Sequence, residues 1–225
     1  MLQEPSKLPS DTMPITTKIC GLATPEALDS ALDHGAAYVG LVFFPPSPRH
    51  VTPDQAAELA ARVAGRAKVV GLFVNPADAL LNQILGKVPL DIIQLHGEES
   101  PSRAAHIKAI TGKSLWKAIP VRRAADIGQA EQYAQIADLA LYDAKPAPGM
   151  QLPGGNGLRF DWTILRNHRH AMPWALSGGL DAGNIAEAVR VTRATLLDVS
   201  SGVERAPGVK DVDKIAAFLQ AASLL

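Results

Sequence analysis

Residues 36–74 read "AAYVGLVFFPPSPRHVTPDQAAELAARVAGRAKVVGLFV", and this stretch decides the fold. Two apolar runs, 36–44 and 68–74, flank the segment 53–64, where apolar residues recur at helical spacing and Pro53 suits the first turn of a helix. The two runs lack the strict alternation of a half-exposed strand, as is typical of parallel strands that are buried on both faces. We therefore predict a right-handed β-α-β unit.

The same unit recurs along the chain. Further apolar runs predict strands at 15–20, 90–95, 113–119, 138–143, 172–177 and 195–200, which makes eight strands in all. Helical spacing between them predicts helices at 76–85, with Asn75 as N-cap, at 100–110 and at 181–192. An open doubly wound sheet is the alternative, but it normally has a glycine-rich first turn, and no G-x-G-x-x-G follows the first run. We predict a single α/β domain, a (β/α)8 TIM barrel, over residues 15–225.

The segment before the barrel, the net charge and the lengths of the apolar runs limit the possible classes of function. Residues 1–14 contain proline, serine and charge but no apolar core, so we expect a short disordered N-terminal extension and not a signal peptide. Lys plus Arg and Asp plus Glu are 22 each, and this net charge of zero argues against a nucleic-acid partner. No apolar run approaches the roughly 18 residues that span a bilayer, so we expect no membrane association.

The chain has a single cysteine, Cys20, which excludes an intrachain disulfide and a cysteine-based zinc site. An unpaired thiol favours the reducing cytoplasm. Cys20 ends the first predicted strand, Asp143 ends the sixth and Asp198 lies near the end of the eighth. Chemistry in a barrel belongs at the carboxyl ends of the strands, so these side chains can converge on one site. The alternatives are a buried apolar cysteine and aspartates that form turns or cap helices.

Two glycine-containing turns follow the last two strands. "LSGGLDAGN" spans residues 176–184 and "DVSSGVE" spans 198–204. In a barrel these loops commonly bind phosphate, because glycine lets backbone N–H groups approach an anion closely. The candidate phosphate-binding residues are Gly178, Gly179, Ser200, Ser201 and Gly202. The alternative is that the glycines merely allow tight turns.

Seven motifs occur in an order and spacing that closely resemble the phosphoribosylanthranilate isomerase family of tryptophan biosynthesis. They are "KICG", "SPR", "QLHG", "LYDA", "PGGNGLRFDW", "LSGGLDAGNI" and "DVSSGVERAPGVKD", and they span Lys18 to Asp211. The resemblance implies an Amadori rearrangement of N-(5-phospho-β-D-ribosyl)anthranilate to 1-(2-carboxyphenylamino)-1-deoxy-D-ribulose 5-phosphate. It implies a small phosphosugar substrate, no metal and no organic cofactor. A monomer and a homodimer both remain open.

The resemblance also implies roles for individual residues. Asp143 would be the general acid that opens the sugar ring, and Cys20 would be the general base that removes the proton from C2. Arg49 would bind the benzoate carboxylate, for which a guanidinium group is well shaped. His96 and Asp198 would line the site beside the phosphate-binding turns.

Both catalytic groups need a particular environment. A free thiol is mostly protonated at neutral pH and a free aspartate mostly ionised, so each is by default in the wrong state. Asp143 must therefore be partly desolvated, or made acidic when substrate binds. Lys18 lies two positions before Cys20, on the same face of the strand, and either favours the thiolate or pairs with Asp198.

Three other functions are alternatives to the isomerase. A pentulose-phosphate epimerase would share the phosphate-binding turns but need His and Asp metal ligands at other strand ends. Indole-glycerol-phosphate synthase would use lysine and glutamate, and no suitable lysine ends strands two to four. A phosphosugar-binding barrel without activity is the alternative from a different class.

Overall fold

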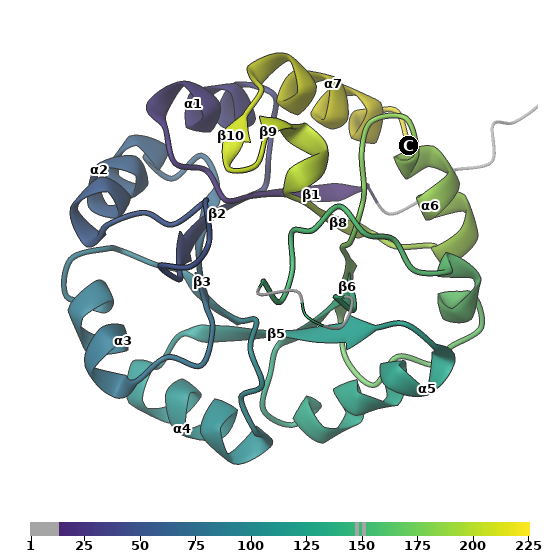
Figure 1. The fold of residues 1–225 in the computed structure, drawn as a ribbon, viewed down its shortest axis with the longest axis horizontal. Helices are drawn as coiled ribbons and strands as arrows, with labels where there is room; N and C mark the ends of the chain where they lie inside the picture. Colours follow the sequence, from purple (N-terminus) through teal and green to yellow (C-terminus); the bar gives the residue numbers. More distant parts are fainter. Residues whose placement is uncertain (1–13, 147–148, 150–151) are drawn as a thin grey trace, which may run out of the picture.

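The computed structural model describes residues 14–146, 149 and 152–225, and these form a closed barrel of eight parallel strands. Helices surround the strands, so that the strands form the inner ring and the helices the outer ring (Figure 1). The barrel strands are β1 (Thr16–Cys20), β2 (Tyr38–Phe43), β3 (Lys68–Phe73), β4 (Ile92–Leu95), β5 (Ser114–Val121), β6 (Leu139–Ala144), β7 (Trp174–Leu176) and β8 (Leu196–Val199). The prediction of a single TIM barrel is confirmed.

The outer ring is less regular than the inner one. The α-helices are α1 (Pro25–Asp33), α2 (Pro53–Val63), α3 (Asp78–Leu85), α4 (Pro101–Thr111), α5 (Ala124–Ile127), α6 (Ile185–Thr192) and α7 (Val212–Ser223). Three 3₁₀ helices, η1 (Gly128–Tyr133), η2 (Trp162–Leu165) and η3 (Ser201–Val203), and a hairpin of β9 (Glu204–Ala206) and β10 (Val209–Lys210) complete the described elements. Between β6 and β7 the position of a helix is taken by the short η2.

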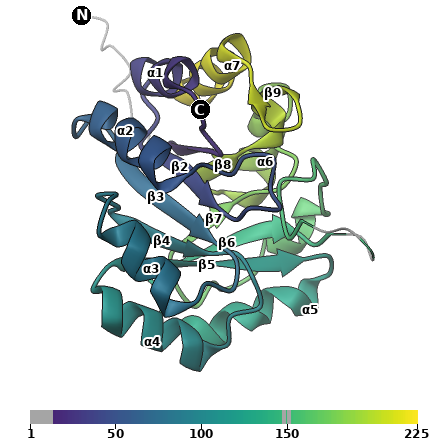
Figure 2. The same cartoon turned by 60° about the vertical axis from the view of Figure 1, so that its left-hand side comes forward.

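Each strand pairs with its sequence neighbours, and β1 closes the ring against β8. In that pairing Lys18 lies opposite Asp198, which brings the first and last strands of the barrel into register at the site. Figure 2, turned by 60°, shows the strands running side by side in one direction with α3 and α4 on their outer side. The alternative of an open sheet is excluded by this closure.

The helix starts follow the capping residues of the sequence in most places. Thr52 caps α2 through a capping box with Gln55, and Pro53 opens the helix as predicted. The expectation that Asn75 caps the next helix is wrong. The helix begins at Asp78, because the Asn75 side chain instead accepts a hydrogen bond from the backbone N–H of Glu98 in the loop after β4.

Two apolar layers hold the barrel together. The interior is filled by eight side chains from alternate positions of the strands: Val70, Ile92, Trp116, Ala118, Leu139, Leu141, Ala175 and Leu196. A second, larger cluster lies between the strands and the helices. Above the interior cluster, Cys20 packs with Val42 and Leu72 and forms the floor of the open end of the barrel.

The predicted extension, residues 1–14, lies outside the described residues except for Pro14. In the part of the chain that the structure describes, no helix combines the length and apolar character needed to cross a bilayer.

Candidate active site

Cys20 ends β1 with its side chain directed into the barrel. Cys20 is 4% exposed and lines a pocket at the carboxyl ends of the strands. On the neighbouring strand Gly40 leaves room for it, since a Cβ there would lie 3.1 Å from the Cys20 sulfur and equally close to the Lys18 ammonium. The thiol therefore lies at the floor of the pocket, not beneath it and not among the helices.

Lys18 pairs with Asp198, one of the two alternatives that the sequence left open. Its fully buried ammonium donates to Asp198 Oδ1 at 2.8 Å and also lies beside the Cys20 thiol. Burial works against this cation, but the negative charge of Asp198 and the thiol outweigh burial and raise the Lys18 pKa above its ordinary value. The Ser177 hydroxyl donates to the second oxygen of Asp198 at 3.2 Å.

The thiol of Cys20 is held in its protonated form by this environment. Burial raises its pKa, and although Lys18 lowers it, the charge of Asp198 acts in the same direction as burial. The ammonium of Lys18 is thus largely neutralised by Asp198 and only partly offsets desolvation.

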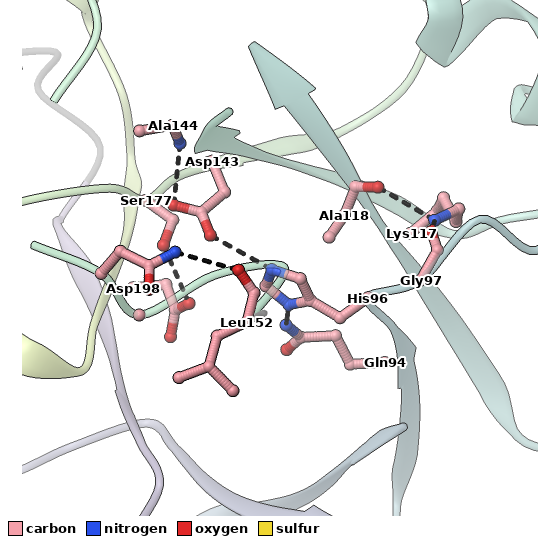
Figure 3. A network of polar contacts seen from close by, with 12 residues as sticks. Gln94, His96, Gly97, Lys117, Ala118, Asp143, Ala144, Leu152, Ser177 and Asp198 are labelled. Carbon is pink, nitrogen blue, oxygen red and sulfur yellow. Dashed lines mark hydrogen bonds and ion pairs between the residues drawn. The ribbon is translucent and has the colours of Figure 1, made fainter. Parts of the chain in front are cut away.

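Asp143 is the next-to-last residue of β6 and is held from two sides. The backbone N–H of Ala144 donates to its Oδ1 at 2.8 Å, and its Oδ2 lies 3.1 Å from His96 Nε2. His96 in turn has its Nδ1 3.0 Å from the side-chain nitrogen of Gln94 (Figure 3). The Asp143 side chain is buried.

The backbone of residues 152–158 passes over this acid group. A Cβ at Gly154 would lie 2.5 Å from both Asp143 Oδ2 and His96 Nε2, so a side chain there would displace one of them. Gly178, on the other side, adopts φ +89° and also contacts Asp143 closely. Glycine at both positions lets the backbone approach the carboxyl group.

Arg49, after β2, is buried and held in a fixed orientation. Its Nε and Nη2 donate to the two oxygens of Glu204 at 2.7 and 2.8 Å, and Nη2 also donates to the Gly155 carbonyl at 3.0 Å. Lys210 donates to Glu204 Oε1 at 2.8 Å, so the carboxylate serves two cations. Burial raises the Glu204 pKa, but Arg49 and Lys210 outweigh it and lower the pKa below its ordinary value.

The two glycine-containing turns lie side by side at the same end of the barrel. Gly178 and Gly179 both have positive φ and line the pocket, together with Ser200 and Ser201. The Ser200 hydroxyl donates to the Cys20 carbonyl at 3.1 Å and accepts from Lys210, which joins this turn to the first strand. Gly202 is not among the described residues that line the pocket; it packs closely against Leu180 instead.

The structure therefore brings nine of the ten predicted site residues to one pocket: Cys20, Arg49, His96, Asp143, Gly178, Gly179, Asp198, Ser200 and Ser201. Sequence reasoning did not assign Ser177, Gln94 or Glu204. Ser177 directly precedes Gly178, and Gln94 lies two positions before His96 on the same face of β4, so local signals existed for both. Glu204 had none, because its partner Arg49 lies 155 positions away.

The polar groups of this pocket are suited to acid–base chemistry on an anionic ligand. A thiol and a carboxyl group face it from different strands, a guanidinium lies at one side, and two glycine turns lie at another. Within residues 14–146, 149 and 152–225, no three His, Cys, Asp or Glu side chains are grouped as a metal site would need.

The chain is similar in sequence to known proteins. A family model for N-(5'phosphoribosyl)anthranilate (PRA) isomerase matches residues 17–221. A Rhodospirillum centenum protein named N-(5'-phosphoribosyl)anthranilate isomerase is 55% identical over 214 residues, which cover 95% of this chain and 100% of the relative. A Paramagnetospirillum magneticum protein of the same name is 53% identical over 210 residues, covering 93% of this chain and 98% of the relative.

Solved structures give the same result at lower identity. The phosphoribosyl anthranilate isomerase of Thermotoga maritima is 32% identical, with a TM-score of 0.83, over 94% of this chain and 100% of that chain. A phosphoribosyl anthranilate isomerase in complex with reduced 1-(o-carboxyphenylamino)-1-deoxyribulose 5-phosphate is also 32% identical, with a TM-score of 0.80 and the same coverage of both chains.

Proposed function

This chain belongs to the N-(5'-phosphoribosyl)anthranilate isomerase family, and from that premise we propose that Cys20 and Asp143 carry out the acid–base chemistry of its reaction. The chain is an isomerase of tryptophan biosynthesis, and the reaction is the Amadori rearrangement of N-(5-phospho-β-D-ribosyl)anthranilate. The observation that supports these roles most directly is that a thiol from β1 and a carboxyl group from β6 line the same pocket.

Asp143 acts first, as a general acid. It donates its proton to the ring oxygen of the aminosugar, the bond between that oxygen and C1 breaks, and the nitrogen lone pair forms the C1–N double bond of an iminium ion. Ala144 N–H and His96 then stabilise the carboxylate that remains, since both hydrogen-bond it.

Cys20 acts second, as the base that removes the proton from C2. The electron pair of the C2–H bond forms the C1–C2 double bond, and the iminium nitrogen becomes neutral, which gives an enolamine. The enolamine tautomerises to the ketone product. Because the pKa of the Cys20 thiol is raised by burial, the rate of this step should increase with pH as the thiolate forms beside Lys18.

The substrate has two anionic ends, and the pocket offers a separate site for each. The glycine turns at Gly178, Gly179 and Ser201 offer backbone groups that would bind the phosphate, and Arg49, which lines the same pocket, would bind the benzoate carboxylate. Since Glu204 occupies Nε and Nη2 of Arg49, the remaining nitrogen, Nη1, is the one that meets the carboxylate.

The remaining expectations are part of the same proposal. The chemistry belongs to residues 15–225, with 1–14 as an extension that takes no part in it. The expected compartment is the cytoplasm, which would keep the single thiol of Cys20 reduced. A monomer and a homodimer are both compatible with a site built from one chain, and light scattering distinguishes them.

A fluorescence assay tests the proposal, since the anthranilate substrate loses its fluorescence on rearrangement. The wild-type enzyme should turn it over in the presence of a metal chelator. Cys20→Ser and Asp143→Asn should each lower kcat by about 10²-fold or more, the usual effect of removing a general acid or base. Asp213→Asn, the same change at an exposed position, is the control. Turnover of Cys20→Ser at the wild-type rate would overturn the role of the thiol.

A further inference from the structure

Gln94 is a fully buried polar residue next to the apolar cluster of the barrel interior. Its side chain points into the barrel from β4, one layer above Ile92, and its exposure is 0%. The amide nitrogen lies 3.0 Å from His96 Nδ1, while the amide oxygen has no hydrogen-bond partner among the described residues. An apolar side chain of this size would serve the packing of the barrel better, because an unpaired buried oxygen is destabilising.

The contact of Gln94 determines which nitrogen of His96 carries a proton. An amide –NH₂ group only donates hydrogen bonds, so Nδ1 must accept and must be unprotonated. The neutral imidazole then carries its proton on Nε2, which faces Asp143 Oδ2 at 3.1 Å. A carboxylate only accepts, so this tautomer is also the one that hydrogen-bonds an ionised Asp143 (Figure 3).

We propose that Gln94 is a positioning residue that holds His96 in its neutral Nε2–H tautomer and so keeps the transferable proton on Asp143. A proton on Nδ1 would point at the amide –NH₂ group, which disfavours both the imidazolium ion and the Nδ1–H tautomer. His96 therefore cannot take the proton of Asp143 without losing the contact with Gln94. This inference rests on the role of Asp143 as general acid in the proposed function.

As a consequence, Asp143 does not lose its proton to His96 and can donate it to the substrate. If His96 became protonated, Asp143 would remain as its carboxylate partner and could not open the sugar ring. With Gln94 in place, His96 acts as a fixed donor that orients Oδ2 before the proton leaves and hydrogen-bonds the carboxylate afterwards.

Two substitutions separate this role from packing. Gln94→Met keeps the length of the side chain but removes its donor, and Gln94→Glu keeps the shape but offers only acceptors to Nδ1. We expect kcat to fall about tenfold in Gln94→Met and further in Gln94→Glu, with KM within about threefold of wild type. Ile92→Met, in the same interior and on the same strand, is the control for packing and should keep the wild-type kcat.

Nitrogen NMR of His96 at neutral pH is the second readout, with protein labelled at histidine nitrogens and the signal assigned through a His96→Asn variant. Wild type should show a protonated Nε2 and a bare Nδ1, and Gln94→Glu should show a protonated Nδ1. A protonated Nδ1 in the wild-type protein would overturn the inference. So would an unchanged kcat in Gln94→Glu.

The two proposals fail in different ways. If the wild-type enzyme turns over substrate but kcat does not respond to Gln94, the positioning role is wrong and the proposed function stands. If Asp143→Asn keeps full activity, the acid role itself is wrong, whatever tautomer His96 adopts. Circular dichroism of each variant confirms that it is folded before kinetics are compared.

Discussion

The Cys20 thiol lies beside the buried ion pair of Lys18 and Asp198, and each of these two residues affects the thiol pKa. Lys18 and Asp198 act on Cys20 in opposite directions: the ammonium lowers the thiol pKa, and the carboxylate raises it. The two are hydrogen-bonded to each other at 2.8 Å, so their effects on the thiol partly cancel, and burial is the largest cause of its raised pKa. Changing one partner alone should therefore unbalance the field.

We expect opposite shifts of the Cys20 pKa in two variants. Lys18→Met removes the cation, so the thiol pKa should rise further, whereas Asp198→Asn removes the carboxylate charge, so the thiol pKa should fall. Because the chain has one cysteine, thiolate absorbance in the ultraviolet reports this group alone. Equal thiol titration in wild type and both variants would show that the ion pair does not act on Cys20.

Arg49 and Glu204 form a second buried ion pair, and we expect this pair to affect substrate binding. Arg49→Ala should raise KM by about 10- to 100-fold, the effect of losing a charge-assisted contact, with a smaller change in kcat. Glu204→Gln should raise KM less, because the arginine remains but is no longer held at both nitrogens.

Steady-state kinetics test whether Glu204 acts through Arg49. KM is measured for both single variants and for the double variant. If Glu204 acts through Arg49, adding Glu204→Gln to Arg49→Ala should change KM little further. Full additivity in the double variant would mean that Glu204 contributes to binding independently of Arg49.

At the scale of elements, the inner ring could be predicted from sequence and part of the outer ring could not. Runs such as 36–44 and 68–74 are apolar because both of their faces are buried, so they are visible without a partner. The outer elements after β5 and β6 are short: α5 has four residues and continues as η1, and η2 stands before β7. Their ends depend on tertiary contacts, as Asn75 shows by bonding to the loop after β4 and not to α3.

The start of α2 is set by local hydrogen bonds between Thr52 and Gln55, so its contribution to stability can be predicted. Thr52→Ala removes the side-chain oxygen that accepts from Gln55 N–H and should lower the free energy of unfolding by about 1 kcal/mol. Gln55→Ala removes the reciprocal contact and should cost less, because the exposed Thr52 N–H can bond to water. Urea unfolding measures both, and kcat and KM should stay at their wild-type values. An unchanged midpoint for Thr52→Ala would contradict the capping role.

At the scale of the whole molecule, the site depends on contacts between the two ends of the chain. The pairing of β1 with β8 places Lys18 opposite Asp198, and the loop after β2 meets the segment after β8 through Arg49 and Glu204. The sequence offered the contact between Lys18 and Asp198 as one of two possibilities. The contact between Arg49 and Glu204 could not be found in it, because closure of the barrel brings these residues together from positions 155 apart. Gln94 was missed for the same reason. It contacts His96 Nδ1, and its importance depends on the contact of His96 Nε2 with Asp143, which only the folded barrel shows.

The outer surface between β6 and β7 also affects the stability of the whole fold. Where a longer helix is absent from the described residues, His170 stacks on Trp174 at 4.3 Å and lies 3.3 Å from the Tyr142 hydroxyl. Burial first, and then the neighbouring His168, lower the His170 pKa from 6.5 to about 4. The folded state thus favours the neutral ring, while the unfolded chain binds a proton at its ordinary pKa.

The free energy of unfolding should therefore fall as the pH is lowered from about 6.5 toward 4, since the unfolded state binds the additional proton over this range. Above the unfolded pKa this contribution is fully present, and solvent screening reduces its size because His170 is only partly buried. His170→Gln should flatten the decline between neutral pH and about pH 5 in urea unfolding, whereas His34→Gln, at an exposed histidine, should leave the wild-type slope. An equal slope in His170→Gln and wild type would mean that another group causes acid destabilisation.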